Sequence, residues 1–494
     1  MSKIQIGRGA TFLYIENAST MVYGYAFWLI LSRITSTDVI GISSSLISIS
    51  TIIVSIACIG IPLGSQRFLG KVFLEKRFED ARTLVKVSLL LVTGGIIICC
   101  SLILITSGWT LSKYDFSLIG ITVFLIASSS ISTQFRYIII ASLETRKLVV
   151  ISIISSGIKL FVTIILVLEG TNELGVMVGF TVAPFLSSIL FAFNVLSLLK
   201  GRQENPTFEF VKTFKPLLKA SLVSWIPLII DTTGAQIGTI IVLGIQGSTN
   251  AGIYFIAFQI TIGISAVIWA LESVTYPALS AMSEGRKLFL WRVIKIGLII
   301  VLPLSSSIIF YSEDVMQIFG FDYKEGAYPL QILLLSILPT AVTVGISILA
   351  YSYGNYAQVL IIGLATTIPR TILYFIFVPW YSGTGAALSF TLGSLIGLIV
   401  SLIIARRLDV FLSWRDLGLI FIIPIALGFV LSNFNIHFVI AILVSVILSY
   451  LLLLKLGTVN RNDIQDSLAV LPSNISNPII DTVNKIGNKL NKKY

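Results

Sequence analysis

Residues 84–107 read LVKVSLLLVTGGIIICCSLILITS, and after Lys86 this stretch contains no charged residue. A helix needs about 20 mainly apolar residues to cross the roughly 30 Å of hydrocarbon in a bilayer. The apolar residues here do not alternate with polar ones, as those of a membrane β-strand do. The stretch therefore predicts a transmembrane helix.

The same pattern recurs along the 494 residues and predicts an all-α polytopic membrane protein with 14 transmembrane helices. The first run contains Glu16 and ends at Arg33 without a small-residue cleavage pattern, so it does not resemble a signal peptide. The runs cover residues 10–32, 39–61, 84–107, 116–140, 148–168, 174–198, 217–244, 251–275, 293–312, 329–351, 357–378, 383–405, 417–433 and 436–456.

The overall composition excludes most soluble classes of protein. The chain is 56% hydrophobic and 12% charged, whereas soluble domains are about 25% charged. This excludes a soluble globular enzyme, a disordered chain and a disulfide scaffold. The three cysteines (Cys58, Cys99 and Cys100) lie inside apolar runs, and His437 is the one histidine, so the sequence predicts no metal site.

The net charge of +11 follows from membrane topology. With the N-terminus inside, 28 of the 34 basic residues, Lys295 among them, fall on the cytoplasmic side. The outer side receives Arg33, Lys113 and Lys324. This asymmetry predicts a multi-pass plasma-membrane protein with both termini in the cytoplasm. The basic excess gives no indication of nucleic-acid binding.

Two halves of the sequence match each other over short motifs. Gly175…Phe180-Thr181 recurs as Gly385…Phe390-Thr391 at an offset of 210 residues, and Pro62 and Pro277 are 215 apart. An offset that covers an even number of helices indicates a parallel repeat, an arrangement common in secondary transporters. The predicted division is an N-terminal six-helix bundle (1–200), a cytoplasmic linker (201–216), a C-terminal six-helix bundle (217–407), two appended helices (408–457) and a cytoplasmic basic tail (458–494). The end of the tail is either an interfacial helix on anionic lipid or a frayed basic segment.

Six ionisable residues fall inside the predicted spans, where each is costly unless it faces a cavity or a partner: Glu16, Arg136, Lys159, Asp231, Glu272 and Arg370. Lys159 and Arg370 lie about 16 and 20 Å deep at 1.5 Å per residue. At the offset of 210, Lys159 maps one residue from Arg370. Two cations at matching depths predict a site that grips an anion between the repeats. The alternative is that these charges form buried ion pairs that only lock helices together.

The other membrane charges are less informative. Arg136 and Glu272 lie within about one turn of the cytoplasmic ends of their spans, so Arg136 can extend to the interface. Glu16 and Asp231 are 215 residues apart, in the register of the two prolines. A carboxylate in a cavity balances a basic site or carries protons or sodium ions.

Four short motifs are similar to those of polysaccharide flippases of the multidrug/oligosaccharidyl-lipid/polysaccharide exporter superfamily. Their order and spacing cover about residues 5–455. The motifs are Ile59-Gly60-Ile61-Pro62 with Arg67-Phe68 and Glu79-Asp80-Ala81-Arg82, then Gly252-Ile253-Tyr254, then Phe319-Gly320…Tyr323…Ala327, and last Val378-Pro379-Trp380-Tyr381-Ser382-Gly383-Thr384-Gly385-Ala386-Ala387.

This resemblance implies two six-helix bundles around a V-shaped cavity and the flipping of a lipid-linked oligosaccharide by alternating access. It implies that cavity cations bind the substrate's phosphate groups. Family members often carry an acidic residue closer to the Gly-Ile-Tyr motif than Asp231 is. The substrate-binding set is then Lys159, Arg370, Arg136, Arg33 and Arg67, and the set for coupling or charge balance is Glu16, Asp231 and Glu272.

The sequence leaves two alternatives open. A cation-coupled multidrug antiporter of the same superfamily would use Glu16 for exchange, although Lys159 and Arg370 would repel cationic drugs. A membrane-embedded glycan polymerase or ligase would need a large outer loop with catalytic residues, and the sequence shows no such loop. We expect a transporter that is not an enzyme and has no cofactor beyond Na+ or H+ coupling. Its expected partners are a lipid-linked anionic glycan, membrane lipids and glycan-assembly enzymes.

Overall fold

The computed structural model describes residues 3–110, 115–199, 210–282, 284–434 and 436–458. Over these residues the chain is helical and contains no strand. Twelve of the described helices are long and apolar enough to cross a membrane. The prediction of an all-α polytopic membrane protein is confirmed.

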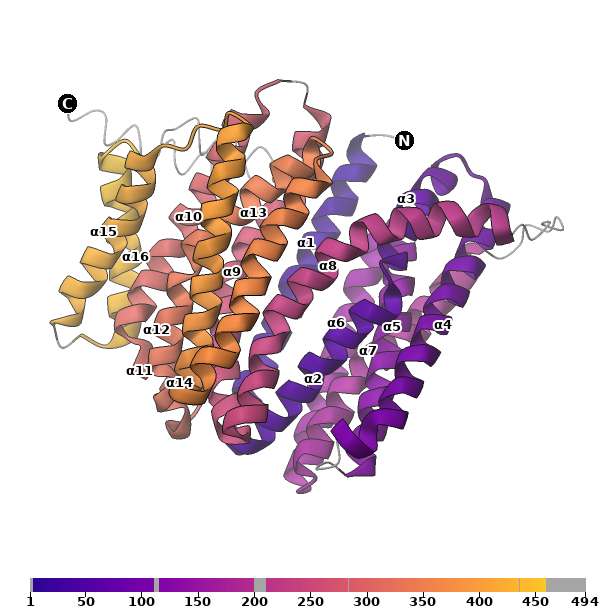
Figure 1. Ribbon diagram of the computed structural model, residues 1–494, viewed down its shortest axis with the longest axis horizontal. Coiled ribbons are helices and arrows are strands. Elements are labelled where there is room, and N and C mark those ends of the chain that lie inside the picture. Colours follow the sequence, from indigo (N-terminus) through magenta and orange to yellow (C-terminus); the bar gives the residue numbers. More distant parts are fainter. Residues whose placement is uncertain (1–2, 111–114, 200–209, 283, 435, 459–494) are drawn as a thin grey trace. The chain divides into compact units, whose positions relative to one another are not determined.

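The chain divides into two compact units, Met1–Gly252 and Ile253–Tyr494. Figure 1 shows the helices of each unit along the colour ramp. Unit 1 contains α1 (Lys3–Ile34), α2 (Thr37–Cys58), α3 (Ile61–Leu74), α4 (Phe78–Thr110), α5 (Phe116–Ser142), α6 (Thr145–Leu168), α7 (Asn172–Leu199), α8 (Phe210–Gln246) and the first turn of α9 (Ser248–Ala281).

Helix α3 is an element that the apolar runs do not predict, because it is too short and too polar to span a bilayer. Ile59 and Gly60 both adopt positive φ angles (48° and 67°), which ends α2, and Pro62 then occupies the first turn of α3. Helix α3 packs against α4, α5 and α8.

The core of unit 1 forms where five helices meet. Leu69 of α3, Val85 of α4, Ile138 of α5, Leu148 of α6 and Phe191 of α7 belong to one buried cluster. Helices α6 and α7 pack together, and α1 packs on α6. These contacts fix the relative rotation of α1, α6 and α7, and so decide which side chains meet between them.

Unit 2 continues α9 and adds α10 (Arg286–Phe310), α11 (Ser312–Gln317), η1 (Phe321–Gly326), α12 (Ala327–Leu335), α13 (Ile337–Ser352), α14 (Tyr356–Arg407), α15 (Trp414–Ser432) and α16 (Phe438–Lys455). Helix α14 holds two of the predicted spans, joined across a kink at Ser382, whose φ and ψ of 51° and −131° are not helical. The total of 14 spans stays a prediction.

The last helix shows how a membrane protein distributes its residues. Helix α16 packs against α10 and α15, and its buried residues include the small Ala441, Ser445 and Ser449. Leu443 and Ile447 are 58% and 56% exposed. Large apolar side chains that face outward fit a lipid environment, where apolar exposure carries no cost.

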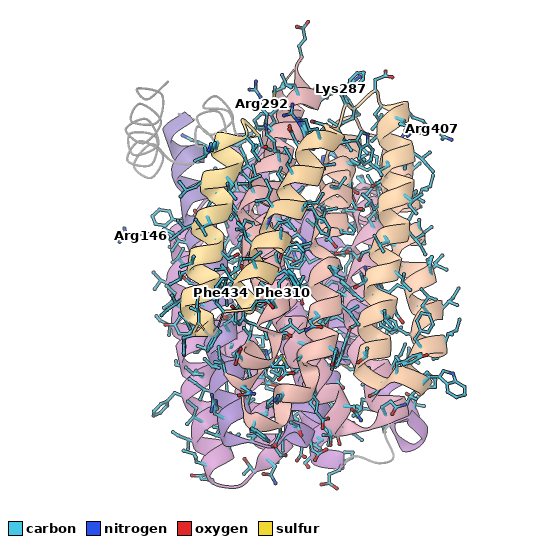
Figure 2. The ribbon with its side chains drawn as sticks, turned by 90° about the vertical axis from the view of Figure 1, so that its left-hand side faces the viewer. Arg146, Lys287, Arg292, Phe310, Arg407 and Phe434 are labelled. Carbon is cyan, nitrogen blue, oxygen red and sulfur yellow. The ribbon has the colours of Figure 1, made fainter. Side chains whose placement is uncertain are left out.

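Basic residues gather at one end of the helices of unit 2. Figure 2 shows Lys287, Arg292 and Arg407 at that end, where α10 begins and α14 ends. The Lys287 Nζ lies 3.7 Å from a carboxylate oxygen of Asp409. The topology prediction requires these three residues on one side of the membrane.

The division by contacts falls after the predicted linker. Helix α8 packs against α2, α3 and α4, so it belongs to unit 1. The first turn of α9 is also held there, since Ser248 and Thr249 donate hydrogen bonds of 2.6 and 2.7 Å to Asp38 at the start of α2. Residues 201–209 and 459–494 lie outside the described residues, and the domain boundaries of the repeat stay a prediction.

Candidate functional site

Lys159 of α6 lies between two aromatic rings in unit 1. Its Nζ is 4.4 Å from the centroid of Phe27 on α1 and 4.3 Å from that of Phe180 on α7. The two rings pack edge to face, with centroids 5.8 Å apart, and Phe27 is fully buried. Both distances are those of cation–π interactions, in which the face of a ring attracts an ammonium group.

No residue that the structure describes forms an ion pair with Lys159. The ammonium charge is therefore stabilised by ring faces rather than cancelled by a carboxylate. Within the described part of the chain, the buried ion pair that the sequence leaves open as an alternative is not formed at this residue.

Arg370 of α14 holds the corresponding place in unit 2. It is 7% exposed, its Nη2 donates a 2.9 Å hydrogen bond to Ser394 Oγ, and its Cζ lies 3.8 Å from the centroid of Phe390. The two halves of α14 can approach this closely because residue 393 is glycine. A Cβ at Gly393 would lie 2.6 Å from the Cβ of Arg370 and 2.9 Å from the carbonyl oxygen of Thr366.

Phe180 and Phe390 occupy equivalent positions of the sequence repeat, 210 residues apart. Each ring lies beside the membrane cation of its own unit. The sequence repeat shows that a Phe-Thr dipeptide recurs, but it does not show that each phenylalanine contacts a cation. Sequence spacing does not predict which side chain a single aromatic residue in an apolar run will meet. The two units thus repeat a cation–aromatic pair.

The aromatic cluster of unit 2 extends from Phe390 into α9. Phe258 meets Phe390 edge to face at 5.2 Å, and Tyr254 stacks on Phe258 at 6.0 Å. Tyr254 and Tyr374 are both fully buried. The Gly252-Ile253-Tyr254 motif therefore supplies a tyrosine to the aromatic cluster that contacts Arg370 through Phe390.

Glu16 pairs with Arg136 in unit 1. The guanidinium binds the carboxylate in a two-pronged arrangement, Nη2 to Oε2 at 2.6 Å and Nε to Oε1 at 3.2 Å. Ser152 donates a third hydrogen bond of 3.1 Å to Oε1. Glu16 is 5% exposed. These contacts join α1 to α5 and α6. The carboxylate of Glu16 therefore pairs with Arg136 rather than with Lys159.

The structure places the remaining predicted residues separately. Arg33 is exposed in the last turn of α1, and Arg67 is exposed on α3. Asp231 is exposed on α8. The side chain of Glu272, on α9, lies outside the described residues.

Lys295 is a buried cation that the topology prediction counts among the cytoplasmic charges. It lies in α10 and is 5% exposed. Its position two residues inside the predicted run 293–312 is the signal that could have marked it as a residue of the span.

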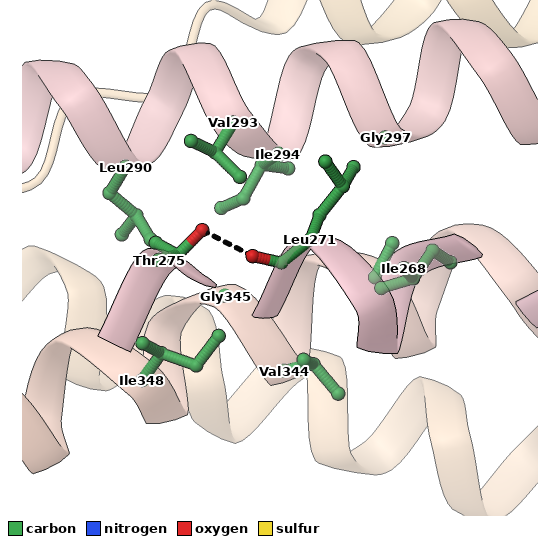
Figure 3. Close-up of a pocket in the computed structure, with 11 residues that line it drawn as sticks. Ile268, Leu271, Thr275, Leu290, Val293, Ile294, Gly297, Val344, Gly345 and Ile348 are labelled. Carbon is green, nitrogen blue, oxygen red and sulfur yellow. Dashed lines mark hydrogen bonds between the residues drawn. The ribbon is translucent and has the colours of Figure 1, made fainter. Parts of the chain in front are cut away.

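A small pocket between α9, α10 and α13 is apolar and belongs to unit 2 (Figure 3). Its lining includes Ile268, Leu290 and Val344. The Thr275 hydroxyl at its edge donates a 2.6 Å hydrogen bond to the carbonyl of Leu271. No described group of three or more His, Cys, Asp or Glu residues is placed to hold a metal ion.

The twelve apolar helices among the described residues define a multi-pass membrane protein. Solved structures share this fold at low sequence identity. A multidrug resistance MATE family transporter of the MOP superfamily, in its inward-facing conformation, matches with a TM-score of 0.61 and 16% identity over 78% of this chain and 94% of its own. The lipid II flippase MurJ matches with 0.59 and 17% over 91% and 98%. A MOP superfamily transporter from Pyrococcus furiosus matches with 0.56 and 16% over 81% and 95%.

Residues 30–327 match the family model described as Polysaccharide biosynthesis protein. The match covers more than half of the chain. The protein belongs to this polysaccharide biosynthesis family, which confirms the resemblance read from the four motifs. A comparison with curated sequences found no match.

Proposed function

We propose that this protein flips a lipid-linked oligosaccharide from the cytoplasmic to the outer leaflet of the plasma membrane by alternating access. Membership of a polysaccharide biosynthesis family supports a glycan substrate. The fold is shared with a lipid II flippase, which supports transport rather than catalysis. The expected partners are membrane lipids and the enzymes that assemble the glycan.

The observation that carries the proposal is the repeated cation–aromatic pair of Lys159 with Phe180 and Arg370 with Phe390. A cation deep in a membrane span is costly and is kept for function. The linkage between a lipid carrier and its glycan is a phosphate or pyrophosphate. Its oxygens form strong charge-assisted hydrogen bonds with ammonium and guanidinium groups, whereas ring faces contribute only about 0.5–2 kcal/mol.

Arg136, Arg33 and Arg67 serve in this proposal as secondary contacts. Arg33 and Arg67 are exposed, so they suit lipid headgroups near the two ends of the path. Arg136 is neutralised by Glu16 in this structure and would reach the substrate only after that pair separates.

Coupling to Na+ or H+ would use the acidic residues of the spans. Asp231 is the carboxylate exposed on α8, whereas Glu16 is buried against Arg136. Glu272 completes the proposed set.

The second candidate is a cation-coupled multidrug antiporter, because transporters of the MATE family share the fold. Lys159 and Arg370 argue against it, since two deep cations repel a cationic drug.

The decisive experiment replaces both cations in one chain, Lys159→Gln and Arg370→Gln. We expect glycan export by intact cells to be lost while the amount of folded protein in the membrane is retained. Arg146→Gln, at an exposed basic residue, is the matched control and should export normally. Lys159→Arg with Arg370→Lys keeps both charges and should retain part of the export. Full export by the glutamine variant would exclude the proposed anion site, and efflux of a cationic drug would favour the antiporter.

A further inference from the structure

Two buried tyrosine hydroxyls lie near Arg370 and are not part of the anion site proposed above. Tyr254, on α9, is 1% exposed and Tyr374, on α14, is 0% exposed. Neither hydroxyl forms a well-aligned hydrogen bond with a described residue, and the group that each one faces is the other phenol. Two phenols that can pair only with each other leave one buried O–H donor unused, which is costly.

The two hydroxyls lie close to each other and within electrostatic reach of Arg370. Tyr374 follows Arg370 by four residues on the same helix, so both side chains extend from one face of α14. The ring of Tyr254 is held by stacking on Phe258, and Phe258 contacts Phe390, the ring under Arg370. The aromatic cluster thus fixes where the Tyr254 hydroxyl points.

Arg370 and the two tyrosines offer hydrogen-bond donors beside a positive charge. A guanidinium has only N–H donors, and a phenol is both a donor and an acceptor. The Ser394 hydroxyl accepts from Arg370 and donates to the carbonyl of Phe390. Two phenols beside a positive charge will donate to an oxyanion, because a cation at this place would be repelled by Arg370.

We propose that Tyr254 and Tyr374, together with Arg370, form an oxyanion-binding site of unit 2 that takes a phosphate oxygen of the transported substrate. The two phenols donate hydrogen bonds and set specificity for a phosphate-linked lipid over an uncharged one. This inference rests on the proposed function, since it extends the Arg370 site. In the conformation of this structure the three side chains are buried, so the anion enters when the helices around them separate.

The experiment uses the full-length purified chain and inorganic pyrophosphate as the probe. The variants are Tyr254→Phe, Tyr374→Phe and the double variant, which remove only the hydroxyls and keep the rings. We expect each single variant to weaken pyrophosphate binding roughly tenfold, because a hydrogen bond to a charged group is lost. We expect the melting temperature without pyrophosphate to change little, since each variant keeps its ring and loses only the contact between the two phenols.

Tyr323→Phe is the matched control. Tyr323 is also 1% exposed and its hydroxyl also has no hydrogen-bond partner in the described part of the chain, but it lies in η1. This variant should bind pyrophosphate as the unchanged protein does. A lower melting temperature with unchanged pyrophosphate affinity in the Tyr254 and Tyr374 variants would mean a structural role and would overturn the inference. Absence of pyrophosphate binding by the unchanged protein would overturn it too.

Glycan export by cells distinguishes failure of the oxyanion site from failure of the proposed flippase function. Export by the unchanged chain, with full pyrophosphate affinity in the double variant, would reject the two tyrosines and keep the flippase. Affinity that depends on the hydroxyls, in a chain that exports no glycan, would keep the oxyanion site and reject the glycan substrate.

Discussion

Arg370 lies face-on to Phe390, with the guanidinium carbon 3.8 Å from the ring centroid, and both residues belong to α14. The kink at Ser382 folds the second half of that helix back along the first. The contact therefore joins two spans that a single continuous helix would keep apart. Lys159 and Phe180 form the same kind of pair between α6 and α7.

Loss of either ring should destabilise its unit. For Phe180→Leu and Phe390→Leu we expect the free energy of unfolding in detergent to fall by about 1–3 kcal/mol, from lost packing and the lost cation–π attraction. Phe193 on α7 and Phe375 on α14 are 66% and 61% exposed and supply the matched controls. Phe193→Leu and Phe375→Leu should change stability little. Equal losses at the positions beside the cations and at the exposed positions would show that the cations do not stabilise these rings.

Removal of the carboxylate partner of Arg136 should be more costly than removal of a surface one. Glu16→Gln leaves a guanidinium that is 29% exposed without its ion-pair partner. We expect the free energy of unfolding to fall by about 2–3 kcal/mol, less than for a fully buried pair because water still reaches the guanidinium. Glu144→Gln, which breaks a surface pair with Lys147, should cost under about 1 kcal/mol. If Glu16→Gln with Arg136→Gln restored none of the loss, the cost would not arise from the unpaired charge.

The approach of the two halves of α14 depends on Gly393. In Gly393→Ala the new Cβ would meet the Arg370 Cβ and the Thr366 carbonyl, so the helices must shift. We expect thermal unfolding to show a loss of about 1–3 kcal/mol. A Cβ at Gly120 on α5 would have no neighbouring atom within 4 Å, so Gly120→Ala is the control and should not destabilise. A neutral Gly393→Ala would contradict the close packing around Arg370.

The predicted topology is open to a direct test with single cysteines in a chain whose Cys58, Cys99 and Cys100 are replaced by alanine. Lys324 and Arg146 are both accessible at the surface, and Lys324 pairs with Glu313 at 3.0 Å. We expect a membrane-impermeant thiol reagent added to intact cells to label Lys324→Cys, which is predicted outside. Arg146→Cys should react only after the cells are permeabilised. The reverse result would invert the predicted orientation.

Much of the architecture is already fixed by local sequence. The length and hydropathy of a run such as 84–107 decide that it forms a membrane helix, because the bilayer satisfies no backbone polar group and selects for helices. The depth of Lys159 and Arg370 follows from their position within a run, since the rise per residue is constant. Their match across the repeat follows from counting alone.

Other features depend on backbone angles and packing that sequence spacing does not report. The break that creates α3 depends on two successive residues with positive φ. Lys295 is buried within α10, which begins at Arg286, although its place among the cytoplasmic charges predicts an exposed side chain.

The sequence by itself determined that the chain is a helical, multi-pass membrane protein, and it predicted the depth of each cation, because hydropathy and helix rise are properties of the local chain. Only the tertiary structure decided which groups those cations meet. Glu16 pairs with Arg136 rather than Lys159, and Lys159 and Arg370 lie against Phe180 and Phe390. The physical reason is that partners come from different helical segments, whose rotation and approach are set by the packing of many side chains at once.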